Sequence, residues 1–380
     1  MKNIPTNPFL ITGYQGPDYF CDREKETASL MSALKNGRNI TLISPRRMGK
    51  TGLIKNVFYY IQKENKSAAC FYLDIFSTQN LQEFVSLLGR SVLGKSDTLS
   101  QSTLKSLFSF FKSCRPVIST DEITGMPSVT LDFIPERSEE TLKEIFTYLN
   151  QSGVECYIAI DEFQQITKYA DDPNIEAALR THIQRCSNAH FVFSGSHRHL
   201  MGAMFTSPAR PFYQSVTLIN LPPISVDKYA EFCLEHFERA SKHLDTLVVT
   251  ELYERFNGIT SYMQKVMNIL FSMTGTGEIC IPSMIDTAIN DLLDFSADTY
   301  DALLYQMPEK QRIVFMAIAA EGKAKAISSG DFVRKYKLQS ASSVSSAVKG
   351  LLEKDFITYD KGIYQVYDQF FQLWLQRNKL

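Results

Sequence analysis

Residues 44–51, which read Ser-Pro-Arg-Arg-Met-Gly-Lys-Thr, restrict the fold of this chain more than any other segment. An apolar run at 39–43 precedes them, and a helical pattern follows from Gly52. This order predicts a buried strand, a tight loop and the N-terminus of a helix. Such a loop points backbone N–H groups at a polyphosphate, and the helix dipole favours the negative charge. The segment therefore predicts an α/β core that binds a nucleotide.

The expected contacts of this loop follow from the chemistry of its residues. Lys50 can reach the β- and γ-phosphates of ATP, and the Thr51 hydroxyl can hold Mg²⁺. The P-loop pattern begins with Gly, whereas this chain has Ser44, which can enter the turn if its φ stays negative. The residues expected to bind the nucleotide are Ser44, Pro45, Arg46, Arg47, Met48, Gly49, Lys50, Thr51 and Gly52. The alternative interpretation is a basic surface loop without a ligand.

The composition is typical of a folded, soluble protein. At 380 residues the chain exceeds one ordinary core, so we expect two or three domains. Hydrophobic residues make up 44% and charged residues 21%, which excludes an intrinsically disordered chain. We expect no membrane partner, because no apolar run is long enough to span a bilayer and the N-terminus lacks a secretory signal. Seven scattered cysteines without a Cys-x-x-Cys pair predict buried free thiols in a reducing cytoplasm.

Charge is unevenly distributed along the chain. The net charge is −1, which gives no general case for a nucleic-acid partner. Residues 308–380, however, hold 12 Lys and Arg against 7 Asp and Glu. A basic terminal module points to an anionic partner, and the alternative is an ordinary solvated surface.

Short apolar segments alternate with helical patterns over the first 222 residues, which predicts a parallel sheet. The predicted strands are 40–43, 69–75, 156–160, 190–193 and 216–220. The predicted helices are 53–64, 81–93, 138–152 and 175–186. Ser-rich and Pro-containing stretches interrupt this order at about 96–137, so we expect an insertion there, a flap or contact surface, around a helix at 104–112.

The remainder of the chain predicts two further domains. Residues 227–293 have a wholly helical pattern, broken at Gly258 and around 274–282. Beyond them, helices at 309–320, 329–336 and 340–354 precede a β-hairpin at 356–359 and 363–366, which predicts a winged helix. We therefore expect a nucleotide-binding core at 1–222, a helical domain at 223–307 and a winged-helix domain at 308–380.

Hydrolysis of a bound nucleotide needs an acid that holds the metal and a group that activates water. The segment Tyr-Ile-Ala-Ile-Asp-Glu places Asp161 and Glu162 at the carboxyl edge of the sheet, where ligands bind. We expect Asp161 to orient Mg²⁺ through water alongside Thr51, and Glu162 to be the general base. Ser194 and Ser196 end the next strand, where a hydroxyl could sense the γ-phosphate or position the water. The alternatives are two solvated acids and a plain Ser-Gly-Ser turn.

An arginine often stabilises the charge on the leaving group in phosphoryl transfer. The candidates are Arg46, Arg47, Arg198 and Arg210. Arg210 lies in Ser-Pro-Ala-Arg-Pro-Phe-Tyr, an expected exposed turn that a neighbouring molecule could meet. Asp74 also ends a strand and could join the site, although a cap or a turn explains it as well. The predicted catalytic residues are Glu162, Lys50, Arg210 and Ser194, and the predicted metal ligands are Thr51 and Asp161.

The order of these motifs resembles a known family. Asp22-Arg-Glu ahead of the loop, Pro-Arg-Arg-Met-Gly-Lys-Thr, Ile-Asp-Glu-Phe-Gln and Ser-Gly-Ser resemble the prokaryotic AAA-like ATPases of the archaeal-type ATPase family. That family belongs to the STAND group of P-loop NTPases. The ending Tyr-Asp-Gln-Phe-Phe-Gln-Leu-Trp-Leu, from Tyr367, is similar to the family's ending after its winged helix.

The resemblance implies an ATPase core, a helical lid and a winged helix, with ATP and Mg²⁺ as ligands. It places Asp22 and Arg23 near the adenine. Two departures are visible: the family's nucleotide-contacting proline is missing near Gly258, and Gly-Arg is missing after Tyr213. The second departure predicts slow hydrolysis, unless Arg210 or Arg198 takes the role of the missing arginine.

Two functional classes follow. The first is an ATP-driven switch in which slow, Mg²⁺-dependent hydrolysis resets a lid and a winged helix that contacts a partner. The second is an ATP-regulated DNA-binding protein with little or no hydrolysis, whose helix at 340–354 enters the major groove. The exposed face of that helix offers mostly serines, with few arginines to read guanine. The partner is therefore either DNA or a protein, and an oligomer is compatible with the sequence.

Overall fold

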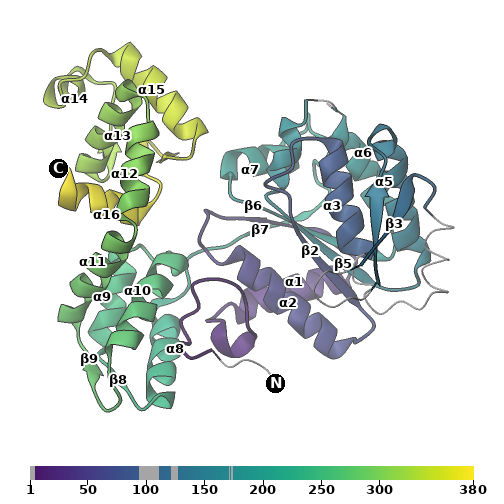
Figure 1. Cartoon of the computed structure of the whole chain (residues 1–380), viewed down its shortest axis with the longest axis horizontal. Helices are drawn as coiled ribbons and strands as arrows, with labels where there is room; N and C mark the ends of the chain where they lie inside the picture. Colours follow the sequence, from purple (N-terminus) through teal and green to yellow (C-terminus); the bar gives the residue numbers. More distant parts are fainter. Residues whose placement is uncertain (1–4, 94–110, 121–126, 171, 173) are drawn as a thin grey trace. The chain divides into compact units, whose positions relative to one another are not determined.

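The computed structural model describes residues 5–93, 111–120, 127–170, 172 and 174–380. The chain forms two compact units (Figure 1). The first unit is Thr12–Tyr229, and the second combines Met1–Ile11 with Ala230–Leu380. Residues 104–110 of the helix expected at 104–112 lie outside the described residues.

The first unit is built on a five-stranded sheet in the order β2-β5-β6-β1-β7, with every neighbouring pair parallel. The strands are β1 (Ile40–Ile43), β2 (Ala69–Asp74), β5 (Cys156–Asp161), β6 (Ala189–Gly195) and β7 (Thr217–Asn220). All five strands predicted from the sequence are therefore present. Parallel strands end at a common edge, so the loops after β1, β2, β5 and β6 meet there.

Helices cover both faces of this sheet (Figure 1). On one face lie α1 (Glu24–Lys35) and α2 (Lys50–Glu64), which pack on each other. On the other lie α3 (Leu81–Leu93), α5 (Ser138–Gln151), α6 (Ile175–Gln184) and α7 (Arg198–Thr206). The sequence pattern did not predict α1 or α7. Short 3₁₀ helices are η1 (Pro17–Tyr19), η2 (Pro135–Arg137) and η3 (Phe163–Lys168).

Alternation along the strands sets which side chains face which layer. Leu73, Ile160 and Phe193 are buried in the apolar core against α3, α5, α6 and α7. Because successive side chains point to opposite faces of a strand, the residues on either side of them face α2. Those residues include Asp161 and Ser194, and the helix that they face begins at the phosphate-type loop.

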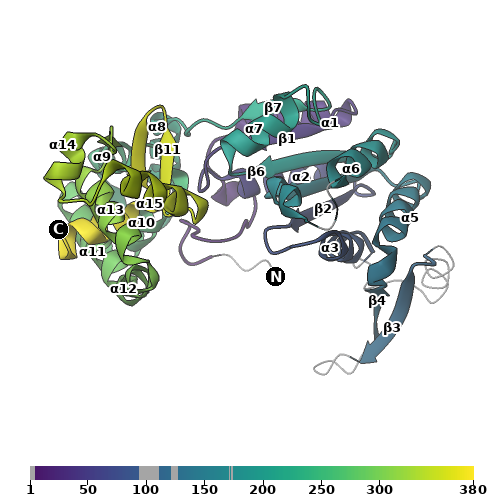
Figure 2. The same cartoon turned by 90° about the horizontal axis from the view of Figure 1, so that it is seen from above.

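The predicted insertion contains a two-stranded antiparallel hairpin, β3 (Cys114–Thr120) and β4 (Pro127–Phe133). Figure 2 shows it projecting away from the sheet beyond α5. Its base is anchored on α5, because the backbone N–H groups of Lys112 and Ser113 each donate to Glu144, at 3.2 Å. The Thr141 hydroxyl adds a hydrogen bond to the Ser113 hydroxyl at 2.8 Å.

The second unit contains most of α8 (Val226–Arg239) and the helices α9 (Thr246–Arg255), α10 (Thr260–Met273) and α11 (Ile285–Phe295), with the 3₁₀ helix η4 (Pro282–Met284). The prediction of a wholly helical segment at 227–293 was wrong in one respect. Two-residue strands β8 (His243–Leu244) and β9 (Ile279–Cys280) pair in parallel. Such short strands leave no alternating pattern to detect. Phe9 packs on the aromatic rings of Phe237 and Phe271, which ties the N-terminal segment to these helices.

The predicted winged helix is present in the second unit. Helices α13 (Glu309–Glu321), α14 (Gly330–Lys335) and α15 (Ala341–Glu353) pack with an antiparallel sheet in the order β10-β12-β11. The strands are β10 (Ala324–Lys325), β11 (Ile357–Asp360) and β12 (Ile363–Val366). Helices α12 (Ala297–Gln306) and α16 (Gln369–Asn378) flank it.

The aromatic C-terminus forms a packed core. Asp368 caps α16 by accepting from the N–H groups of Phe370 and Phe371. The Phe371 ring stacks on Tyr300, and Trp374 is 2% exposed. In the part of the chain that the structure describes, no helix combines the length and hydropathy needed to cross a membrane.

Candidate nucleotide-binding site

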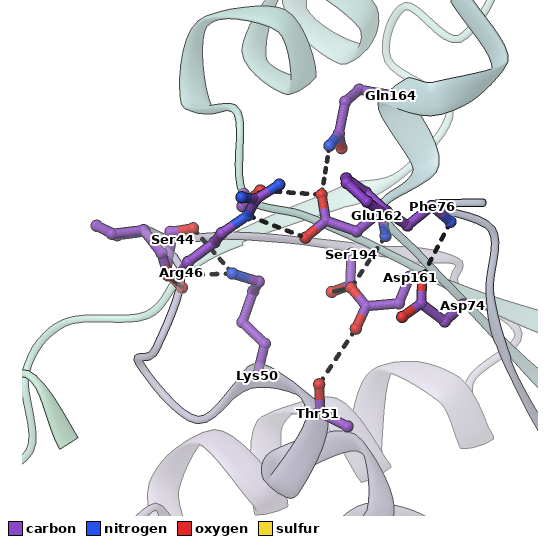
Figure 3. Close-up of polar contacts among 12 residues, drawn as sticks. Ser44, Arg46, Lys50, Thr51, Asp74, Phe76, Asp161, Glu162, Gln164 and Ser194 are labelled. Carbon is purple, nitrogen blue, oxygen red and sulfur yellow. Dashed lines mark hydrogen bonds and ion pairs between the residues drawn. The ribbon is translucent and has the colours of Figure 1, made fainter. Parts of the chain in front are cut away.

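The loop between β1 and α2 curls around the Lys50 ammonium (Figure 3). Lys50 Nζ donates to the carbonyl oxygens of Ser44 at 3.0 Å and Pro45 at 3.1 Å. Gly49 caps α2 with φ 86°, and Arg47 also has a positive φ, 69°. Ser44 is fully buried and is not among the residues with positive φ, as its side chain requires. The turn that usually begins with Gly therefore forms here with Ser.

The predicted metal ligands lie next to each other. Thr51 Oγ1 donates to Asp161 Oδ2 at 3.1 Å, which joins the start of α2 to the end of β5. The fully buried Ser194, at the end of β6, donates its hydroxyl to the other carboxylate oxygen of Asp161. The expected neighbourhood of these two strands is thus present, and Ser194 reaches the site by orienting Asp161.

Tyr72 also belongs to this group, although it is not among the residues predicted from the sequence. Its hydroxyl donates to Asp161 Oδ2 and lies 3.3 Å from Thr51 Oγ1. Burial first, and then the Asp161 carboxylate, raise the pKa of Tyr72, so the phenol stays protonated. The sequence offered one indication of this position. Tyr72 lies two residues before Asp74, so the two side chains are on the same face of β2.

Glu162 sits at the edge of the sheet with its carboxylate enclosed by polar groups. Its φ of 55° turns the chain from β5 into η3. Ser196 Oγ donates to Glu162 Oε2 at 2.9 Å, and Gln164 Nε2 donates to the same oxygen (Figure 3). Arg46 Nε lies 3.8 Å from Glu162 Oε1 and donates to Ser196 Oγ at 3.1 Å. A residue of the phosphate-type loop thereby contacts the predicted general base.

Asp74 faces the same edge. Strands β2 and β5 pair with Asp74 opposite Asp161. Burial, followed by the charges of Asp161 and Glu162, raises the pKa of Asp74. Its carboxylate also accepts the N–H of Phe76 at 2.9 Å. Asp74 therefore forms the expected turn and also lies near the site.

Of the other candidate arginines, Arg210 is engaged elsewhere in the unit. Its guanidinium forms an ion pair with Glu176, the second residue of α6. The side chains of Arg210 and Glu176 are 34% and 11% exposed. Arg198 opens α7, and its side chain lies outside the described part of the structure.

The segment ahead of α1 is fixed by hydrogen bonds to the chain that leaves β7. Arg23 is 3% exposed and donates to the carbonyl oxygen of Pro222 at 2.6 Å. Asp22 accepts the N–H of Ser225 at 3.3 Å. Burial raises the pKa of Asp22, but the N–H donors of Arg23 and Ser225 outweigh it and the pKa is lowered. The adenine-side role of Asp22 and Arg23 stays a prediction.

Two more loop residues pack against the protein. Met48 is 4% exposed. Gly52 lies under the ring of Phe20, which would be 2.9 Å from a Cβ at that position. The segment that carries Asp22 and Arg23 therefore passes close to the start of α2.

Comparison with known proteins gives the chain a family. Residues 20–266 match the model of the ATPase domain predominantly from Archaea. The chain belongs to this ATPase family. Residues 298–377 match the model of a probable winged helix domain, which agrees with the fold of the second unit. No curated protein matches the chain.

Solved structures similar to this chain cover nearly its full length. A Walker-type ATPase of Pyrococcus abyssi has a TM-score of 0.65 at 16% identity, over 97% of this chain and 99% of that one. The Aeropyrum pernix ORC1 protein, in complex with DNA, has a TM-score of 0.56 at 14% identity, over 98% and 97%. The ORC2 protein of the same organism, in ADPNP–ADP complexes, has a TM-score of 0.52 at 14% identity, over 97% of each chain. At these identities the likeness is one of fold.

The residues of this ATPase domain fit a magnesium ion. Mg²⁺ prefers oxygen ligands and is usually held by one or two protein groups together with phosphates and water. Thr51 and Asp161 present a hydroxyl and a carboxylate oxygen 3.1 Å apart, beside the loop that would hold the phosphates. Among the described residues there is no cluster of three or more His, Cys, Asp or Glu that could hold a metal by itself.

Proposed function

We propose that this chain binds ATP in the 44–51 loop and hydrolyses it slowly with Mg²⁺, as a nucleotide-dependent switch. One observation carries the proposal. The Thr51–Asp161–Ser194 chain of hydrogen bonds and the Glu162 carboxylate lie at one edge of the sheet, beside the loop around Lys50. Membership of an ATPase family supports it, as does the nucleotide in the ORC2 complexes of Aeropyrum pernix. Placement in the STAND group is part of this proposal.

Each residue has a defined task in the proposed reaction. Lys50 leaves the carbonyl oxygens of Ser44 and Pro45 to bind the β- and γ-phosphates, and the loop N–H groups hold the remaining oxygens. Thr51 and Asp161 would hold Mg²⁺, which would supply positive charge beside the phosphates. Glu162 orients the attacking water and accepts its proton. Ser194 keeps Asp161 in one orientation.

Slow turnover follows from the contacts of Glu162 and Arg210. The Glu162 carboxylate is held by Ser196, Gln164 and Arg46 in this structure, so a water must compete with those partners. Arg210 is paired with Glu176 and would have to break that pair to assist in hydrolysis. We propose that hydrolysis accelerates only when a partner rearranges one of these contacts.

In the proposed switch, the second unit would change position in response to the bound nucleotide. Within it, Tyr262 of α10 donates to the carbonyl oxygen of Tyr367 at 3.2 Å and accepts the N–H of Gln369 at 3.0 Å. These bonds tie the helical part to the helix that follows the winged-helix sheet. A movement of the helical lid on ATP binding would therefore carry the winged helix with it.

Rates of MgATP hydrolysis for the wild type and Glu162→Gln test the hydrolytic role. Removing the general base should lower kcat by about 10²-fold or more while ATP affinity changes little. Equal rates for the two proteins would remove Glu162 from the mechanism.

A second candidate function is DNA binding through the winged helix. The ORC1 structure in complex with DNA has a similar fold, and α15 exposes Ser342, Ser345, Ser346 and Lys349. A helix of this kind can enter the major groove. Titrating duplex DNA at increasing salt tests this candidate, because phosphate contacts make affinity fall steeply with salt. An absence of salt-sensitive affinity would exclude it.

The location of the protein is part of the proposal. The six cysteines whose side chains the structure describes are free thiols, and five of them are buried. Free thiols persist in reducing compartments, so we propose a cytoplasmic protein.

A further inference from the structure

Gln164, the second residue of η3, is buried beside the predicted general base. It is 3% exposed, and its Nε2 donates to Glu162 Oε2 (Figure 3). Its carbonyl oxygen, Oε1, is buried and has no hydrogen-bond partner among the described residues. The amide is therefore satisfied only on the side that faces Glu162.

The neighbouring strand is shaped to receive this amide. Gly195 ends β6, and a Cβ built there would lie 2.2 Å from Gln164 Oε1 and 2.7 Å from Met201 Cγ. Gly195 is not among the residues with positive φ, so close approach explains the glycine and backbone conformation does not. Any larger residue at 195 would push the Gln164 amide away from its present position.

A buried side-chain amide with only one of its two polar groups hydrogen-bonded does not optimise the stability of the fold. A buried acceptor without a partner lowers stability, and an apolar side chain of the same length would avoid that loss. The presence of glutamine at position 164 therefore suggests that its side-chain NH₂ group, which donates to Glu162, has a functional role. The other partners of the Glu162 carboxylate are less suited to hold it, because Arg46 is 28% exposed and the hydroxyl of Ser196 is shared with Arg46.

We infer that Gln164, seated on Gly195, is a positioning residue that fixes the carboxylate of Glu162 toward the attacking water. The inference rests on the proposed function of Glu162 as general base. When Arg46 turns to a bound phosphate, its contact with Glu162 is lost and the Gln164 bond remains. A general base held in one place is productive, because small displacements of a reacting group cost large factors in rate.

The variant Gln164→Met tests this role in the full-length protein, since it keeps the length of the side chain and removes the donor. Gln165→Met is the matched control, because the neighbouring amide donates to the carbonyl oxygen of Thr78 at 2.9 Å, away from Glu162. We expect Gln164→Met to lower kcat for ATP by about tenfold or more, with KM within about twofold. We expect its melting temperature to be unchanged or raised, whereas a purely structural role predicts a lower one. Gln165→Met should keep the wild-type kcat.

Two further measurements separate this role from others. In the Glu162→Gln background, adding Gln164→Met should lower kcat little further, because Gln164 acts through the Glu162 carboxylate that is already absent. In ¹⁵N-glutamine-labelled, nucleotide-free protein, the side-chain amide resonance of Gln164, assigned by its loss in Gln164→Met, should move on Glu162→Ala. The Gln165 resonance should stay in place.

Each result decides a different point. Wild-type kcat in Gln164→Met, or a further tenfold loss beyond Glu162→Gln, would overturn the positioning role. If the wild type hydrolyses no ATP, the proposed function fails, and the amide resonance alone decides the contact. A resonance that moves on Glu162→Ala then supports Gln164 as the group that holds Glu162, and one that does not move overturns it.

Discussion

At the scale of single residues, the candidate site depends on strand alternation at the carboxyl edge of the sheet. Tyr72, Asp161 and Ser194 come from three neighbouring strands, and the buried apolar residues beside them in sequence face the opposite core. Their polar groups are consequently turned toward Thr51 at the start of α2. A one-residue shift in any of these strands would turn its polar residue away from the site.

Tyr72 is expected to tune the metal site. Its hydroxyl contacts both oxygens that would hold Mg²⁺, as an outer partner that orients them. Partners of this kind change metal affinity by about 10–100-fold when they are removed. We predict that Tyr72→Phe raises the Mg²⁺ concentration needed for half-maximal ATP hydrolysis by about tenfold. Tyr157→Phe, on the adjacent strand but away from the edge, is the control, and an equal Mg²⁺ requirement in both variants would contradict the role.

Arg210 is expected to matter for stability, because it neutralises a buried acid. Burial raises the pKa of Glu176, and the Arg210 charge lowers it in part. We predict that Arg210→Ala destabilises the protein by about 1–3 kcal/mol, less than a fully buried pair because the pair is partly exposed. Adding Glu176→Gln should restore most of the loss.

The pH dependence of that effect has a definite sign. Without Arg210 the pKa of Glu176 rises further, so the loss is full where Glu176 is ionised and shrinks as the pH falls below its pKa. Thermal unfolding of Arg210→Ala at pH 8 and at pH 5 measures this. A lower kcat with an unchanged melting temperature would instead assign Arg210 to catalysis.

Motif residues of the site could be predicted from the sequence, and their supports could not. Lys50, Thr51, Asp161 and Ser194 lie together because a strand–loop–helix order and parallel strands determine where they go. Tyr72 lies in no motif, and Gln164 ends the Ile-Asp-Glu-Phe-Gln segment without a role assigned from the sequence, so each is recognised by the atoms it contacts. The partner of Arg210 was also beyond prediction, because it depends on how α6 packs against a turn 34 residues later.

At the scale of elements, the sheet was the predictable part. Five apolar runs gave five strands, because buried parallel strands need continuous apolar residues. The β3–β4 hairpin was missed because Pro116 lies within β3 and Pro127 begins β4, and proline argues against a strand. The helix α16 is absent from the predicted elements, although Asp368 is a typical cap residue at its start.

The link between α10 and α16 is expected to stabilise the second unit. Tyr262→Phe removes a hydroxyl that donates to Tyr367 and accepts from Gln369. We predict a loss of about 1–2 kcal/mol, because the backbone groups left behind are partly buried. Tyr305→Phe, on an 87% exposed side chain, should change nothing. Denaturant unfolding, followed in the second unit, measures the stability of both variants. Equal unfolding free energies for Tyr262→Phe and the wild type would show that the hydroxyl of Tyr262 does not stabilise the unit.

At the scale of the whole molecule, the ATPase core and the winged helix lie in different compact units of one chain. The phosphate-type loop, the predicted metal ligands and Glu162 all belong to the first unit, and the basic segment 308–380 belongs to the second. The proposed nucleotide switch requires such a division, in which one unit would sense the ligand and the other would present a surface. The partner for that surface could not be predicted, because no motif on α15 specifies one.

Residues 44–51 are proposed to form a MgATP site, and ATP affinity measured by calorimetry tests this proposal most directly. Lys50→Ala should weaken MgATP binding by about 10–100-fold, since it removes charged hydrogen bonds to the phosphates. Lys63→Ala, at the exposed far end of the same helix, should bind as the wild type does. Equal affinities for the wild type and Lys50→Ala, or no ATP binding by the wild type, would contradict the account.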